Sequence, residues 1–142
     1  MTALAIRPYQ AGDEQAIVAL WQACQLTRAW NNPYRDIARK LSTQANWFLV
    51  GTIKDKLTAS AMFGYDGHRG WVNYLAVLPA SQGKGHARQM MQAGETLLLK
   101  AGCPKLSLQI RSSNAAVISF YQHLGYAADD VVSMGKRLIA DI

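Results

Sequence analysis

The sequence of 142 residues has few cysteines, no long hydrophobic run and few acidic side chains. Its two cysteines, Cys24 and Cys103, form no CxxC pair and no Cys/His cluster, so the sequence predicts neither a metal site nor a redox motif. No apolar run approaches the roughly 20 residues of a membrane-spanning helix, and the N-terminal residues lack the apolar core of a signal peptide. We therefore expect a soluble, cytoplasmic protein without a metal or a membrane partner.

Acidic residues are scarce relative to basic ones. The chain has nine Asp and Glu residues and 15 Lys and Arg residues, which gives a net charge of +6. Such a chain can bind nucleic acid, an acidic partner or a cofactor with several phosphates. Because the basic residues are scattered and accompany no helix-turn-helix or zinc-finger signature, we expect no nucleic-acid partner. A basic nucleic-acid-associated protein is kept as an alternative.

Half of the residues are hydrophobic, which is enough for one packed core, and the length is too short to favour two. We expect a single domain over residues 1–142. Alternating and helical spacings of apolar residues predict a mixed sheet flanked by helices. Strands are expected at about residues 4–8, 47–53, 56–65, 71–78, 105–111, 126–132 and 133–139, with a tight turn at residues 54–55. Helices are expected at about residues 13–26, 32–44, 87–101 and 114–125.

The most informative segment leads from an apolar strand through a glycine-rich turn into a helix. Gly83 and Gly85 allow a ligand close to the main chain, and the first amides of a helix have no acceptor within it. A helix dipole disfavours positive side chains at this end unless an anion binds there. The segment therefore predicts a phosphate site, with an ordinary glycine turn as the alternative. Three basic side chains flank the glycines: Lys84, His86 and Arg88.

A second motif follows about thirty residues later, where Asn114 and Gly125 are typical of the start and the stop of a short helix. Together the two segments resemble the GNAT superfamily of acetyl-CoA-dependent N-acetyltransferases. The superfamily's cofactor loop is matched at Gln82, Gly85 and Ala87. Its second motif has Val117 here in place of the usual alanine. That motif is matched at Asn114, Phe120, Tyr121, Gly125 and Tyr126. Residues 29–33, 65–70 and 102–105 also resemble a small bacterial branch, the YpeA-like proteins.

The resemblance implies an α/β fold (α+β mixed): a central, mostly antiparallel, twisted sheet of about six to seven strands flanked by about four helices. It also implies that acetyl-CoA is the cosubstrate and that a primary amine attacks its thioester directly in a ternary complex. Leu75, Ala76 and Val77 would act through their main chain, with ordinary sheet core as the alternative for their side chains. The remaining cofactor residues would be Gln82, Gly83, Lys84, Gly85, His86, Ala87, Arg88, Asn114 and Tyr121.

Tyr121 matches the family tyrosine that protonates the departing thiolate, a role suited to a phenol with a pKa near 10. Its alternative role is core packing beside Phe120. Many relatives carry a carboxylate on the strand before the cofactor loop, where this chain has Asn73 and Tyr74. The candidates for the general base are Asp66, which also suits a turn, His68 and Tyr74.

The acceptor pocket in such folds is shaped by the first two helices. The candidates here are Arg28, Trp30, Asn31, Tyr34 and Arg35. Their aromatic and cationic mixture indicates an acceptor with a carboxylate or a ring, although Trp30 and Tyr34 also suit a wedge between helices. Because sheet edges can pair between subunits, a homodimer is a further expectation. The missing strand carboxylate leaves a non-catalytic acyl-CoA-binding regulatory domain as an alternative function.

Overall fold

A computed structural model describes residues 3–141 and contains one five-stranded sheet in the order β1-β2-β3-β4-β5. The first four strands are antiparallel, and β5 joins β4 in parallel. The sheet is therefore mixed and mostly antiparallel, as predicted, but it has fewer strands than expected. The strands are β1 (Ala5–Pro8), β2 (Phe48–Ile53), β3 (Lys56–Tyr65), β4 (Gly70–Val77) and β5 (Leu106–Ser107).

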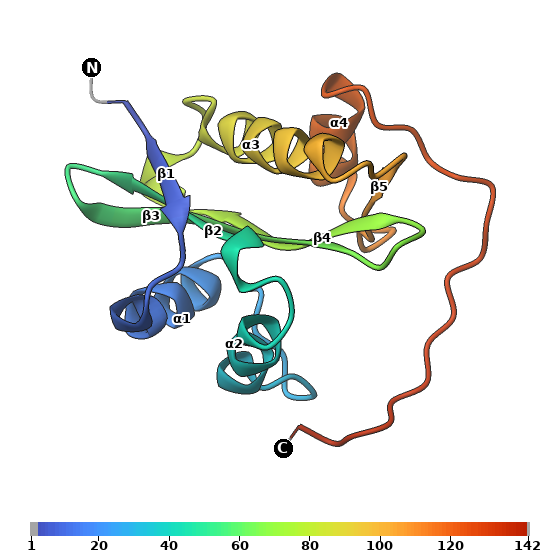
Figure 1. Ribbon diagram of the computed structural model, residues 1–142, viewed down its shortest axis with the longest axis horizontal. Helices are drawn as coiled ribbons and strands as arrows, with labels where there is room; N and C mark the ends of the chain where they lie inside the picture. Colours follow the sequence, from blue (N-terminus) through green and yellow to red (C-terminus); the bar gives the residue numbers. More distant parts are fainter. Residues whose placement is uncertain (1–2, 142) are drawn as a thin grey trace.

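Four α-helices cover the sheet, two on each face (Figure 1). One face packs α1 and α2 over a core that includes Trp21 and Phe48. The other packs α3 and α4 over a core that includes Phe63, Met90 and Tyr121. The sheet therefore separates two apolar layers. The helices are α1 (Glu14–Ala23), α2 (Pro33–Leu41), α3 (His86–Lys100) and α4 (Ala115–His123).

Local sequence signals explain several of the element boundaries. Asn32 caps α2 by accepting from the amides of Tyr34 and Arg35, and Asn114 caps α4 by accepting from the amide of Val117. The Lys54–Asp55 turn has φ angles of 50° and 64°, as expected for a tight hairpin. These predictions are confirmed.

The C-terminal segment differs from the prediction. Strands expected over residues 126–132 and 133–139 do not form within the described residues, and β5 is shorter than the expected 105–111. Tyr126 packs against Tyr121 on the α4 side, whereas Asp141 binds Arg35 and Arg39 on α2. Because its two ends are held on opposite faces, the segment runs around one side of the molecule as an extended chain (Figure 1). The prediction of two final strands is therefore wrong.

Strand β4 carries a bulge in its middle. Asn73 pairs with Met62 and Ala76 pairs with Ser60, so that Tyr74 and Leu75 together face one residue of β3. Tyr74 has a φ of 54°, and its side chain packs in the layer under α1 and α2, whereas Leu75 packs in the layer under α3 and α4. The two residues of the bulge thus contribute one side chain to each apolar layer.

Beyond the bulge, the outer edge of β4 is open. β5 pairs with β4 only at Gly70–Leu106 and Trp71–Ser107. The edge of β4 from Val72 to Val77 therefore has no partner strand in residues 3–141. Within those residues, no helix is both long and apolar enough to cross a membrane.

Candidate active site

The glycine-rich loop links the open edge of β4 to the start of α3. Gly83 and Gly85 have φ angles of 78° and 82°, a conformation that side chains other than glycine rarely adopt. A Cβ built on either glycine has no heavy atom within 4 Å, so the space beside the loop is open. Gly85 is also the N-cap of α3. The loop therefore exposes its main chain next to a helix N-terminus.

The amides of this loop are unpaired donors. Within the described chain, no main-chain or side-chain acceptor binds the N–H groups from Gly83 to Arg88. His86 is buried at the first turn of α3, and its Nδ1 atom has no partner there either. Lys84 and Arg88 are exposed beside these amides. Open donors, a helix N-terminus and two cations form a site that fits the phosphates of a nucleotide cofactor.

A side-chain hydrogen bond to one carbonyl oxygen links the glycine-rich loop to the end of β4. Val77 O accepts from Gln82 Nε2 at 3.0 Å and from Cys24 Sγ at 3.2 Å. Burial raises the pKa of the Cys24 thiol, which keeps it protonated and suits a structural role. Leu75, Ala76 and Val77 lie along the open edge just before this carbonyl, so the cradle and the edge form one continuous surface of main chain.

Tyr121 lies on α4 within the core of the same face as α3. Its ring meets Phe120 and Tyr126 edge-on, with centroid distances of 5.1 Å and 5.6 Å. Burial raises the pKa of Tyr121 to about 12. Its hydroxyl has no hydrogen-bond partner among residues 3–141. Tyr121 is therefore both a packing residue and a phenol that holds its proton at neutral pH.

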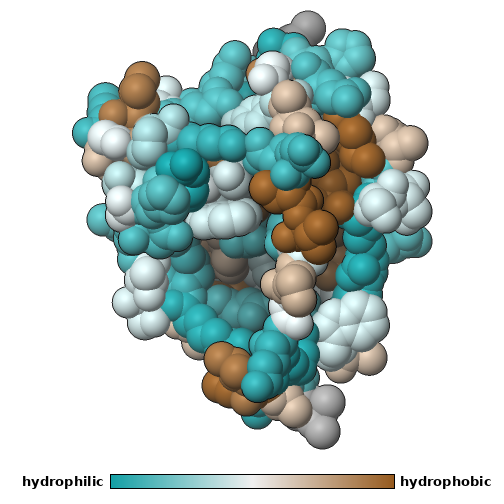
Figure 2. Space-filling view, turned by 90° about the vertical axis from the view of Figure 1, so that its right-hand side faces the viewer, coloured by the Kyte–Doolittle hydropathy of each residue, from teal (hydrophilic) through white to brown (hydrophobic). Residues whose placement is uncertain are grey.

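Tyr121 also borders a large hollow of about 1470 Å³ between β5, α4 and the C-terminal segment. Figure 2 looks at this side of the molecule and shows the hollow beside apolar surface. Several apolar side chains of the segment are exposed, including Val132 and Met134. None of Gln82 to Arg88 lines this hollow, so it lies apart from the glycine-rich loop.

Comparisons with known proteins agree with this geometry. The acetyltransferase (GNAT) family matches residues 14–126. The chain belongs to the GNAT acetyltransferase family. An acetyltransferase of Yersinia enterocolitica is 43% identical over 136 residues, which cover 96% of each chain. This protein is thus an acetyl-CoA-dependent acetyltransferase.

Solved structures of this family share the fold. The ribosomal-protein-S18-alanine N-acetyltransferase of Escherichia coli is similar with a TM-score of 0.72 and 25% identity, covering 87% of this chain and 77% of that one. The aminoglycoside acetyltransferase AAC(6')-Iy, bound to a CoA-linked bisubstrate analogue, has a TM-score of 0.77 and 16% identity, covering 96% and 99%. Membership of the YpeA-like branch stays a prediction.

Two of the three base candidates of this acetyltransferase lie away from the cofactor loop. Asp66 and His68 belong to the turn before β4, at the opposite end of the strand from Val77. Asp66 accepts from the amides of His68 and Arg69 at 2.8 Å and 2.7 Å. These bonds lower its pKa, with the Arg69 amide contributing most, so Asp66 is a weaker base than an ordinary aspartate. Of the three candidates, only Tyr74 lies at the bulge of β4.

The acceptor candidates of the acetyltransferase occupy the loop between α1 and α2 and the start of α2. Arg28 donates to the carbonyls of Gln25 and Thr27, which closes the loop after α1. The Trp30 side chain is 47% exposed. The Arg111 guanidinium lies over its ring, 5.7 Å from the ring centroid. Asn31 accepts from Arg137 of the C-terminal segment at 3.3 Å. This loop therefore meets both the connection between β5 and α4 and the C-terminal segment.

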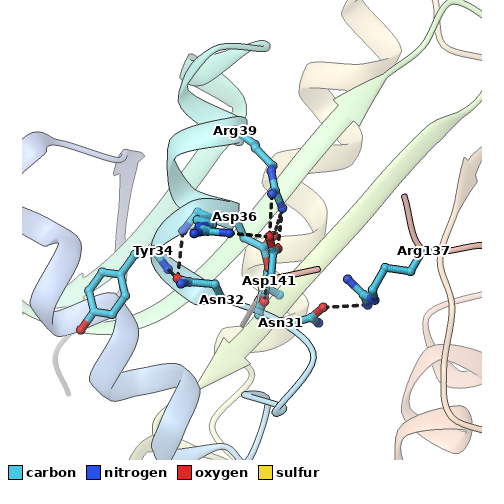
Figure 3. A network of polar contacts seen from close by, with 9 residues as sticks. Asn31, Asn32, Tyr34, Asp36, Arg39, Arg137 and Asp141 are labelled. Carbon is cyan, nitrogen blue, oxygen red and sulfur yellow. Dashed lines mark hydrogen bonds and ion pairs between the residues drawn. The ribbon is translucent and has the colours of Figure 1, made fainter. Parts of the chain in front are cut away.

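Figure 3 shows the polar network around the start of α2, in which Asp36, Arg39 and Asp141 are gathered and Tyr34 points away. Asp141 is buried and accepts from Arg39 at 2.7 and 2.8 Å and from Arg35 at 3.3 Å. Arg35 is therefore already engaged. Neither Asp36 nor Asp141 was predicted from the sequence, because Tyr74 is distant from Asp36 along the chain and both arginine partners of Asp141 are distant from it.

Proposed function

We propose that this acetyltransferase moves the acetyl group from acetyl-CoA to a primary amine by direct attack within a ternary complex. The observation that carries the proposal is the cradle of unpaired amides from Gly83 to Arg88, continuous with the open edge of β4. We also propose that the whole chain forms one domain. The cytoplasmic location, the homodimer and the absence of a nucleic-acid partner stay predictions.

The cofactor would be held mainly by main chain. In our proposal, the amides of Gly83 to Ala87 bind the diphosphate, while Lys84 and Arg88 add positive charge. The open edge at Leu75 to Val77 offers main-chain donors and acceptors to the pantetheine arm and one amide to the developing oxyanion. Asn114 has an amide nitrogen left for the cofactor, because only its oxygen is used in capping α4. When bound, acetyl-CoA supplies an activated thioester.

Tyr121 is the proposed proton donor. As the amine nitrogen forms its bond to the carbonyl carbon, the carbon–sulfur bond breaks and Tyr121 gives its hydroxyl proton to the sulfur. The hydroxyl then regains a proton from water. A phenol is protonated at neutral pH, so the proton is present at the start of each turnover.

Our proposal for the acceptor class rests on the loop between α1 and α2. Arg28, Trp30, Asn31 and Tyr34 offer exposed aromatic surface and a nearby cation, which supports an amine that also bears a ring or a carboxylate. The Escherichia coli neighbour is, by its name, an N-acetyltransferase of an alanine of ribosomal protein S18. A protein or peptide amine is therefore tested first. Membership of an acetyltransferase family favours the enzyme over a non-catalytic acyl-CoA-binding domain.

The test is CoA thiol release with acetyl-CoA and three probe amines: a peptide with a free N-terminal alanine, an N-terminally blocked peptide with one lysine, and neamine. We expect Tyr121→Phe to lower kcat by about 10²-fold with the best probe, because the proton donor is removed. Its dissociation constant for acetyl-CoA should change little. Tyr9→Phe is the matched control, since Tyr9 stacks on Phe48 outside the site.

Equal kcat values for Tyr121→Phe and Tyr9→Phe would remove Tyr121 from the role of proton donor. If the wild type releases no CoA with any of the three amines, transfer to these amine classes is contradicted.

A further inference from the structure

Tyr74 is fixed at the bulge by three contacts. Its ring stacks on Trp21 with a centroid distance of 3.7 Å. Its carbonyl oxygen accepts from Ser60 Oγ at 2.8 Å, and Ser60 Oγ itself accepts from Trp21 Nε1 at 3.0 Å. Its hydroxyl donates to Asp36 Oδ2 at 2.7 Å. The side chain is therefore held in one position between the strand that carries the open edge and helix α2.

Asp36 is available for a further proton. Its side chain is 24% exposed, and Oδ2 already accepts from Tyr74. Among residues 3–141, Oδ1 has only a long contact of 3.4 Å with Arg39 NH1. The carboxylate therefore has lone pairs free on the solvent side.

The neighbouring cations are directed elsewhere. Arg39 donates two hydrogen bonds to the Asp141 carboxylate, one from each terminal guanidinium nitrogen. Arg35 donates one more to the same carboxylate (Figure 3). The groups that face Asp36 are thus Tyr74 from β4 and Arg39 from α2, with Asp141 and Arg35 behind them. Because Arg39 makes its short bonds to Asp141 and only a 3.4 Å contact to Asp36, Asp36 is not held in a strong ion pair of its own.

From this geometry we infer that Asp36, reached through the hydroxyl of Tyr74, is the proton acceptor for the incoming amine, an inference that rests on the proposed function. β4 itself carries no carboxylate, and Asp36 is joined to its bulge by a hydrogen bond from a different element. The ammonium form of the acceptor loses one proton to the Tyr74 oxygen as the Tyr74 proton moves to Asp36 Oδ2. The amine keeps the electron pair of its broken N–H bond, and Asp36 later returns the proton to water.

Tyr74 alone does not suit this role. Burial, together with the hydrogen bond to Asp36, raises the pKa of Tyr74 above that of an ordinary phenol. Its hydroxyl is therefore protonated at neutral pH and can only pass on a proton while it receives another. Asp36 supplies the negative charge that drives this exchange.

The experiment compares pH profiles of kcat/KM for the wild type, Asp36→Asn and Tyr74→Phe, using acetyl-CoA and the N-terminal alanine peptide, or whichever of the three probes turns over best. At pH 7 each variant should lose about 10²-fold, since proton transfer by a positioned group contributes this much. The loss should shrink as the pH rises past the pKa of the probe amine, roughly 7.7–8.0 for the α-amino group of the alanine peptide and about 10.4 for lysine, because the amine then deprotonates without help. The double variant should lose no more kcat/KM than the less active of the two single variants, because both residues act in one proton relay.

Asp55→Asn is the matched control, because Asp55 lies in the β2–β3 turn at a φ of 64°, which asparagine tolerates. A ratio of wild-type to Asp36→Asn activity that stays constant with pH indicates a merely structural role and overturns the inference, while the proposed function stands. Wild-type protein that binds acetyl-CoA but releases no CoA with any probe contradicts both.

Discussion

At the scale of single residues, Tyr74 is unusual because it combines a bulky side chain with a φ of 54°. Left-handed backbone costs a non-glycine residue free energy, so such a residue persists only where its surroundings fix it. The stack on Trp21 and the bonds to Ser60 and Asp36 do so. Residues held in this way cluster at functional sites, in keeping with the position of Tyr74 beside the open edge.

Ser60 is the buried link in this arrangement. Its hydroxyl accepts from Trp21 Nε1 and donates to the carbonyl of Tyr74. Ser60→Ala would leave that donor and that acceptor unpaired in the core, so we expect the free energy of unfolding to fall by about 1–3 kcal/mol. Urea unfolding followed by tryptophan fluorescence measures the loss. Ser42→Ala, at an exposed site, should change the stability by less than about 0.5 kcal/mol; equal losses for both would show that the Ser60 contacts are dispensable.

At the scale of elements, the sequence predicted what local chemistry determines. Asn32 and Asn114 cap helices through side chains only two or three residues from the amides they bind, and such signals are read directly from the chain. The turn with Gly83 and Gly85 was also foreseen, because a glycine-rich loop between strand and helix has a recognisable spacing.

Pairing across the fold was not predictable in the same way. Residues 126–139 include strand-forming residues, yet they pair with no strand of the sheet, and Asp141 holds the end of this segment on α2. Tyr74 and Asp36 are 38 positions apart, and their hydrogen bond depends on how α2 packs below the bulge. The sequence named Tyr74 as a base candidate but offered no reason to connect it with Asp36.

At the scale of the whole molecule, the C-terminal segment joins the two faces of the sheet. Apart from the packing of Tyr126, its attachments are side-chain contacts, including the pairs of Lys105 with Asp129 and of Asn31 with Arg137. Asp141 is the buried end of this connection. Loss of its charge should therefore loosen the segment before it disturbs the sheet.

The ion pairs of Asp141 predict a pH dependence. Arg39, followed by Arg35, lowers the pKa of Asp141 from 3.8 to about 2. A carboxylate with a depressed pKa stabilises the folded state above its ordinary pKa, and this contribution is lost as the pH falls from about 4 through 2. Asp141→Asn should thus be less stable than the wild type at pH 6, with a smaller difference at pH 3. Urea unfolding at the two pH values tests this; a difference independent of pH contradicts it.

The central claim is that the loop before α3 binds acetyl-CoA, and calorimetric titration tests it most directly. The wild type should bind acetyl-CoA with a micromolar dissociation constant. Gly85→Glu, which places a carboxylate in the cradle, should bind at least about tenfold more weakly than Gly85→Ala, which carries the same backbone strain without the charge. Equal affinity of the two folded variants, or no binding by the wild type, would contradict the account.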